Sequence, residues 1–121
     1  MSKRILAVDD QEDNRKILRD RLTAAGYEVI EAVDGEQAVE IALAMVPDLI
    51  LMDIQLPGID GYEATRRIKA APLLKAVPVI AVTSYALSGD DEKAFEAGCD
   101  AYIPKPFSPR ALLVKIKEYI G

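Results

Sequence analysis

The sequence contains no histidine and a single cysteine, Cys99, which excludes histidine acid–base chemistry, an intramolecular disulfide and a metal site built from several cysteines. We interpret Cys99 as a buried small hydrophobic residue rather than a sensor thiol. Long apolar runs are also absent, because the longest, such as residues 41–46, fall far short of the roughly 18 residues that span a bilayer. The apolar stretch from Ile5 to Val8 is too short for a signal-peptide core. These absences predict a cytoplasmic protein.

The composition is that of one globular domain. The chain has 121 residues, of which 50% are hydrophobic and 29% charged, and it shows no repeat, linker or low-complexity segment. Its net charge of -5 weakens any nonspecific attraction to nucleic acid. We expect a monomer that contacts neither DNA nor a membrane directly. The start at Met1 and the completeness of the last expected helix favour a single domain, residues 1–121, without an output domain.

Apolar runs of strand length alternate along the chain with stretches of helical periodicity. The expected strands cover residues 3–8, 27–32, 49–53, 78–82 and 101–103, and a helix is expected after each. Acidic residues in the second segment indicate an exposed edge strand. Right-handed crossovers then favour an α/β fold of the flavodoxin-like, doubly wound type, with a parallel five-stranded sheet in the order 2-1-3-4-5 and five helices.

The third expected strand carries a carboxylate at its end. The residues from Leu49 to Met52 are all apolar and are bounded by turn formers, which is typical of a strand buried on both faces. Such a strand places Asp53 at the sheet edge where open α/β proteins bind ligands. A simpler interpretation is that Asp53 only starts a turn.

Four further polar residues are expected at the same sheet edge: Asp9, Asp10, Thr83 and Lys105. Two like charges about 4 Å apart repel by roughly 4 kcal/mol at an effective dielectric constant near 20, so clustered aspartates require a cation or raised pKa values. An all-oxygen site of this kind suits Mg²⁺, with Mn²⁺ as an alternative, and Mg²⁺ commonly shares its coordination shell with phosphate.

This set of residues could perform phosphoryl chemistry. Lys105 would supply a cation, Thr83 a hydroxyl donor, and Asp53 a nucleophile able to form an aspartyl phosphate. Taken singly, each residue has a plainer interpretation: Thr83 ends a strand, Lys105 is solvated, and Asp9 caps a helix. Their joint placement at strand ends favours the phosphate site.

The same residues resemble the receiver domains of two-component response regulators, across essentially the whole chain. The similar segments are the Asp9-Asp10 pair, residues 53–61 (DIQLPGIDG), Thr83-Ser84 and Lys105-Pro106-Phe107.

The resemblance implies a phosphoacceptor and a metal site. Asp53 would accept a phosphoryl group from a phosphohistidine of a sensor histidine kinase or a histidine phosphotransfer protein. Mg²⁺ would be held by Asp10, Asp53 and the backbone carbonyl of Gln55, with Asp9 acting through water.

The resemblance also implies a switch. Lys105 and Thr83 would hold phosphate oxygens, and Thr83 with Tyr102 would then change the surface formed by the fourth helix, fifth strand and fifth helix. A plainer interpretation of Tyr102 is a partly buried core aromatic. The Lys105-Pro106 bond resembles a cis peptide of the family. Gln55 and Tyr85 occupy positions that resemble those tuning the lifetime of the phosphoryl group.

The function implied is that of a single-domain response regulator resembling the cell-division and phosphorelay regulators, whose phosphorylated face binds a downstream protein. It would be no enzyme beyond its own phosphorylation and dephosphorylation. A phosphorelay intermediate that passes phosphate to a histidine phosphotransfer domain uses identical chemistry and is the alternative.

Two other classes fit less well. An aspartate-nucleophile phosphatase requires a second aspartate as general acid where this chain has Gln55. A flavodoxin-like electron carrier would have its flavin phosphate repelled by Asp9, Asp10, Glu12 and Asp13.

Overall fold

The computed structural model describes residues 2–83 and 90–121 of the chain. Strands and helices alternate along it in the order β1 (Arg4–Val8), α1 (Glu12–Ala24), β2 (Glu28–Ala32), α2 (Gly35–Met45), β3 (Leu49–Asp53), α3 (Gly61–Ala70), β4 (Val79–Thr83), α4 (Asp90–Ala97), β5 (Ala101–Pro104) and α5 (Pro109–Ile120). A short 3-10 turn over Pro72–Leu74, which the sequence pattern did not predict, connects α3 to β4. Among the described residues, no helix has the length and apolar character needed to cross a membrane.

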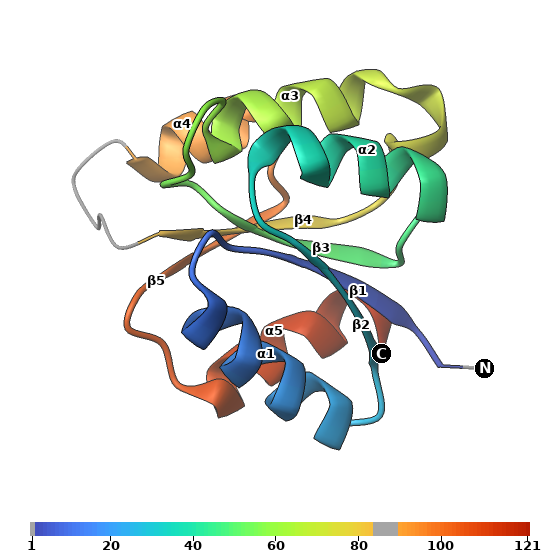
Figure 1. The fold of residues 1–121 in the computed structure, drawn as a ribbon, viewed down its shortest axis with the longest axis vertical. Helices are drawn as coiled ribbons and strands as arrows, with labels where there is room; N and C mark the ends of the chain where they lie inside the picture. The colour runs from blue at the N-terminus through green and yellow to red at the C-terminus, as the bar shows by residue number, and fades with distance from the viewer. Residues whose placement is uncertain (1, 84–89) are drawn as a thin grey trace.

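The five strands form one parallel sheet in the order β2-β1-β3-β4-β5, which confirms the predicted fold and strand order. Helices α2, α3 and α4 cover one face of the sheet, and α1 and α5 cover the other (Figure 1). Every residue of β3 and of β4 is buried, as expected for strands covered on both faces, whereas the edge strand β2 is partly exposed.

Side chains at the starts of three helices satisfy backbone N–H groups that lack an intrahelical partner. The pairs are Asp34 with the N–H of Gln37, Asp60 with that of Glu63, and Ser108 with that of Ala111. Gly26 ends α1 with a φ of 95°, a left-handed conformation that favours glycine.

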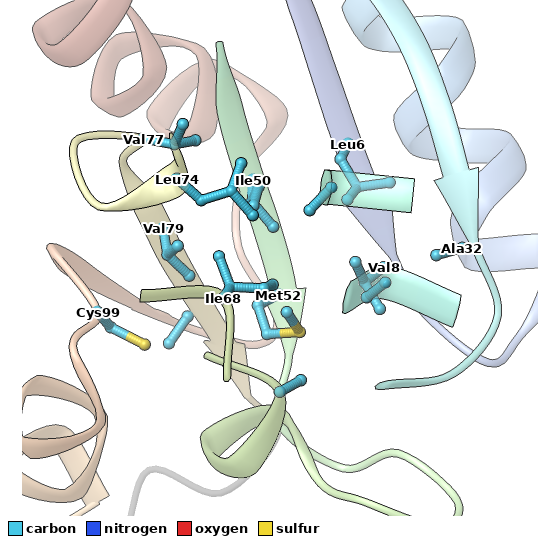
Figure 2. Close-up of a cluster of buried hydrophobic side chains, with 14 of the residues drawn as sticks. Leu6, Val8, Ala32, Ile50, Met52, Ile68, Leu74, Val77, Val79 and Cys99 are labelled. Atoms are coloured by element: carbon cyan, nitrogen blue, oxygen red, sulfur yellow. The ribbon is translucent and has the colours of Figure 1, made fainter. Parts of the chain in front are cut away.

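Two apolar layers stabilise the sheet, one on each face. Figure 2 shows the layer beneath α2, α3 and α4, where side chains from the strands meet Ile68 of α3 and Leu74 of the 3-10 turn. On the other face, Leu22 of α1 and Leu112 and Ile116 of α5 pack on the strands. The sheet edge that carries the predicted polar residues is therefore held by strands that are covered on both sides.

The orientation of α1 and the end of α2 differ from the periodicity-based expectation. Ile17 is 55% exposed and Met45 is 40% exposed, although helical periodicity in the sequence places both on or beside the apolar faces of their helices. The face that α1 turns toward the sheet carries Arg15, Leu18 and Leu22, so a charged residue occupies one position of the buried stripe.

Tyr27 provides a test of the packing on the α1–α5 face. Its side chain is buried, and its hydroxyl finds no hydrogen-bond partner among the described residues. Because an unsatisfied buried hydroxyl costs about 1–3 kcal/mol, we expect Tyr27→Phe to raise the free energy of unfolding by about 1 kcal/mol. Urea denaturation measures this change. Tyr119→Phe is the matched control, since the Tyr119 hydroxyl donates to the carbonyl of Asp100 at 3.0 Å and its loss should lower stability. Destabilisation of both variants alike would contradict the assignment.

Candidate functional site

Three aspartates meet at the C-terminal edge of the sheet. Asp9 and Asp10 directly follow β1, and Asp53 is the last residue of β3. Because β1 and β3 are neighbours in the sheet, the two strands deliver the three side chains to one place. One carboxylate oxygen of each lies within 4.8 Å of those of the other two. We call this group the acidic trio.

Lys105, which follows β5, is the cation that faces the acidic trio. Its Nζ lies 3.2 Å from Oδ2 of Asp9 and 3.2 Å from Oδ2 of Asp53. Burial by itself would lower the pKa of Lys105, but the charges of Asp53 and Asp9 outweigh it and raise that pKa, so the ammonium stays charged. The acidic trio thus carries more acidic groups than the single ammonium of Lys105 can neutralise.

Asp53 is buried and is held by two hydrogen bonds. It is 5% exposed, its Oδ1 accepts a hydrogen bond from the backbone N–H of Gln55 at 3.1 Å, and its Oδ2 accepts from Lys105. Burial raises the pKa of Asp53 to about 6; the charge of Lys105 opposes this rise and that of Asp9 adds to it. Burial therefore disfavours the ionised form of this carboxylate, and another cation nearby would stabilise it.

Asp9 and Asp10 differ in their exposure. Asp9 is 2% exposed, its Oδ1 accepts from the N–H of Gln11 at 2.9 Å, and its own N–H donates to the carbonyl of Ala32 at 3.1 Å. Asp10 is exposed, so the trio is open to solvent on that side. The donor set consists of oxygen atoms only, which fits a hard divalent cation such as Mg²⁺.

Gln55 also links the ends of β3 and β4. Its side-chain amide Nε2 donates to Oγ1 of Thr83 at 2.7 Å, and Thr83, the last residue of β4, is fully buried. Thr83 is thus placed in the strand next to that of Asp53. Ligation of a metal by the backbone carbonyl of Gln55 stays a prediction.

The remaining predicted residues lie on β5 or beyond the described part of the chain. Tyr102 is half-buried on β5, pairs in register with Ala81 of β4 and packs against the apolar layer on the α2–α4 face. This position fits a partly buried core aromatic, and the switch role of Tyr102 stays a prediction. The Lys105-Pro106 peptide bond is cis. Tyr85, a predicted lifetime-tuning residue, lies outside the described residues.

An open crevice of about 540 Å³ leads from the surface to Asp9, Asp53 and Lys105. Its other walls are mainly apolar and come from α1, strands β1, β3 and β4, the segment after β5 and the start of α5: Val8, Asn14, Ile17, Leu18, Leu51, Val82, Pro106, Phe107 and Pro109. A reactive group of a partner molecule could therefore approach Asp53 along an apolar wall.

The sequence interpretation missed two polar residues of α1 that contact the site. Arg15 donates from Nη1 to the backbone carbonyl of Asp9 at 2.8 Å, and Nδ2 of Asn14 lies 3.5 Å from Oδ1 of Asp9. A signal for Arg15 was present, because it precedes Leu18 by three residues and Leu22 by seven, which places a charge on the apolar stripe.

A flavodoxin-like sheet with an acidic trio and a lysine at its carboxyl edge defines a receiver-type α/β domain. The model of the response regulator receiver domain family matches residues 5–117, and the chain belongs to this family. Receiver domains of response regulators are phosphoacceptor switches of two-component signalling.

Named relatives and solved structures agree with this assignment. The chain is 46% identical, over 100% of its length and 98% of the relative's, to the polar-differentiation response regulator DivK of Brucella ovis. It is 40% identical to the receiver domain of a sensor histidine kinase of Pseudomonas aeruginosa, with a TM-score of 0.93 and coverage of 100% of this chain and 99% of that chain. That structure has a magnesium ion coordinated in its active-site cleft. A chemotaxis response regulator of Vibrio cholerae is 28% identical, with a TM-score of 0.93 over 98% of this chain and 99% of the other.

Proposed function

We propose that this chain is a single-domain response regulator in which Asp53 accepts a phosphoryl group from a phosphohistidine in a Mg²⁺-dependent reaction. The observation that carries the proposal is the position of Asp53: its buried carboxylate contacts Lys105 and lies within the acidic trio. The donor would be a sensor histidine kinase or a histidine phosphotransfer protein, as membership of the receiver family implies.

In the proposed transfer, an oxygen of the Asp53 carboxylate attacks the phosphorus atom. The new P–O bond forms as the P–N bond to the donor imidazole breaks, and the imidazole leaves with the electron pair of that bond. Lys105 would hold an oxygen of the transferred group, and so would the Thr83 hydroxyl once it turned toward the phosphate. Mg²⁺, held by Asp10, Asp53 and the carbonyl of Gln55 with Asp9 acting through water, would neutralise charge on the phosphoryl oxygens.

The proposed output is protein binding. Phosphorylation would reposition Thr83 and Tyr102 and change the face formed by α4, β5 and α5, to which a downstream protein binds. We propose that the chain acts in the cytoplasm as a monomer without direct contact with nucleic acid. The name of the 46% identical relative supports a pathway that controls polar differentiation.

Intact mass spectrometry with a small phosphodonor tests the acceptor. Wild-type protein incubated with acetyl phosphate and Mg²⁺ should gain one phosphoryl group, and chelation with EDTA should prevent the gain. Asp53→Asn should gain none, because the amide cannot form an acyl phosphate. Asp60→Asn is the matched control, since Asp60 caps α3 in the neighbouring loop and should leave the gain unchanged. Undiminished phosphorylation of Asp53→Asn would refute the proposal.

A transfer assay separates the proposed output role from that of a relay intermediate. Phosphorylated wild-type protein is mixed with a histidine phosphotransfer protein, and the phosphoryl group is followed on both proteins. Retention on Asp53 supports an output regulator, whereas rapid loss to the second protein's histidine supports a relay.

A further inference from the structure

Arg15 is a buried charge on the face of α1 that packs against the sheet. Its side chain is 9% exposed and shares that face with Leu18 and Leu22. A buried guanidinium is costly unless its donors find partners. The guanidinium of Arg15 must therefore find hydrogen-bond acceptors at this buried position.

The donors of Arg15 reach three groups around the first strand end. Nη1 donates to the backbone carbonyl of Asp9 at 2.8 Å, and Nε donates to Oε1 of Glu31 on β2 at 3.2 Å. Nη2 forms a close ion pair with Glu12 in the first turn of α1. The second oxygen of Glu31 accepts from Arg19 at 2.8 Å. Glu31 on β2 and Glu12 on α1 thus hold the guanidinium of Arg15 in place, and its Nη1 donates to the carbonyl of Asp9.

The carbonyl that Arg15 holds belongs to the peptide unit joining Asp9 to Asp10. Because a peptide unit is planar, fixing its oxygen sets the direction in which the Asp10 Cα and side chain leave Asp9. The N–H of Asp9 is already fixed by the carbonyl of Ala32. Arg15 supplies the second restraint, and Asp10 itself is exposed.

We propose that Arg15 is a positioning residue of the acidic trio: its hydrogen bond to the Asp9 carbonyl orients the Asp9–Asp10 peptide so that both carboxylates face Asp53. Glu31 on the edge strand β2 holds Arg15 in this position. This inference rests on the proposed function only in that the bound cation is Mg²⁺. Partners that orient the ligands of a metal typically change its affinity by about 10–100-fold when they are removed.

Mg²⁺ titration followed by amide NMR tests the proposal. Arg15→Met should raise the dissociation constant for Mg²⁺ at least about tenfold. Its thermal stability should be lower than that of the wild type, because removing the guanidinium alone leaves the Glu31 carboxylate and the Asp9 carbonyl without this partner, so the affinity is measured on the folded protein. Arg15→Lys should fall between the two, since an ammonium can reach the carbonyl but cannot also hold Glu31 in the fork geometry. Arg19→Met is the matched control: it loses its ion pair with Glu31 but makes no contact with Asp9, and its Mg²⁺ affinity should stay within about twofold.

A metal-free measurement separates this inference from the proposed function. In EDTA, the amide resonance of Asp10 should shift in Arg15→Met and remain in place in Arg19→Met. An unshifted Asp10 amide, or a Mg²⁺ affinity of folded Arg15→Met within twofold of wild type, would overturn the inference. Failure of the wild type to bind Mg²⁺ would instead count against the proposed function, and the Asp10 amide would still decide the role of Arg15.

Glu31→Gln covers the case in which Arg15→Met fails to fold. This variant keeps the shape of the side chain but weakens the restraint on Arg15, so it should lower Mg²⁺ affinity severalfold and shift the Asp10 amide. An unchanged affinity together with an unshifted amide in Glu31→Gln would overturn the inference.

Discussion

Gly61→Ala is expected to destabilise the protein and to displace Asp53 at the same time. Gly61 is the first residue of α3 and packs directly on the end of β3, where a Cβ atom would lie 2.3 Å from the Asp53 carbonyl oxygen and 2.7 Å from Cα of Ile54. Both contacts are with backbone, which no side-chain rotation can relieve. Overpacking of this kind typically costs about 1–3 kcal/mol, and a contact this short places the expected loss at or above the upper end.

The displacement should appear as a loss of binding as well as of stability. Urea denaturation measures the free energy of unfolding, and a titration with beryllofluoride and Mg²⁺ measures whether the site still assembles. Gly26→Ala is a control that separates the two effects. Gly26 has a φ of 95° and open space around its Cβ position, so alanine there should cost about 1–2 kcal/mol of backbone strain without touching the site. Equal binding by both variants would show that Gly61 does not position Asp53.

Asp53→Asn is expected to stabilise the metal-free protein at neutral pH. The pKa of Asp53 is raised to about 6, mainly by burial and despite the charge of Lys105. The unfolded chain has an ordinary aspartate pKa of about 3.9, so the folded state binds this proton more tightly. The stability associated with this group is therefore fully present below about pH 4 and is lost as the pH rises through about 6. Asparagine cannot ionise and should avoid that loss.

The expected gain at pH 7.5 is about 1–3 kcal/mol, since each unit of pKa shift corresponds to about 1.4 kcal/mol. Urea denaturation in EDTA from pH 4 to pH 8 should show wild type and Asp53→Asn converging at the acid end and diverging above pH 6. Other carboxylates titrate in both proteins, so the difference between the two curves isolates Asp53. Added Mg²⁺ should stabilise the wild type more than the variant, because ligand binding favours the folded state. A difference that does not change with pH would contradict the assigned pKa.

The buried strands and the helix caps were predictable because local chemistry determines them. The apolar run from Leu49 to Met52 defines a strand covered on both faces, and Asp34, Asp60 and Ser108 each supply a side-chain acceptor at a helix start. Parallel strands then bring Asp53 beside Asp9, because their carboxyl ends share one edge of the sheet.

Other features depended on packing that the pattern does not contain. Arg15 lies in the buried stripe of α1 because Glu31, sixteen residues later on the edge strand, provides its partner. The exposure of Met45 depends on where α2 ends relative to the sheet, and helix ends are the least certain part of a periodicity argument. The pKa of Asp53 results from burial by elements throughout the chain, so no local motif encodes it.

Gln55 touches the ends of two strands through two different parts of itself. Its backbone N–H holds the Asp53 carboxylate, and its side-chain amide holds the Thr83 hydroxyl. A rotation of the Asp53 carboxylate and a rotation of the Thr83 hydroxyl would therefore each change a hydrogen bond of Gln55, even if the strands stay in place. Substituting a side chain that lacks an amide donor would leave the first connection intact and sever the second, so that the two motions could be observed independently.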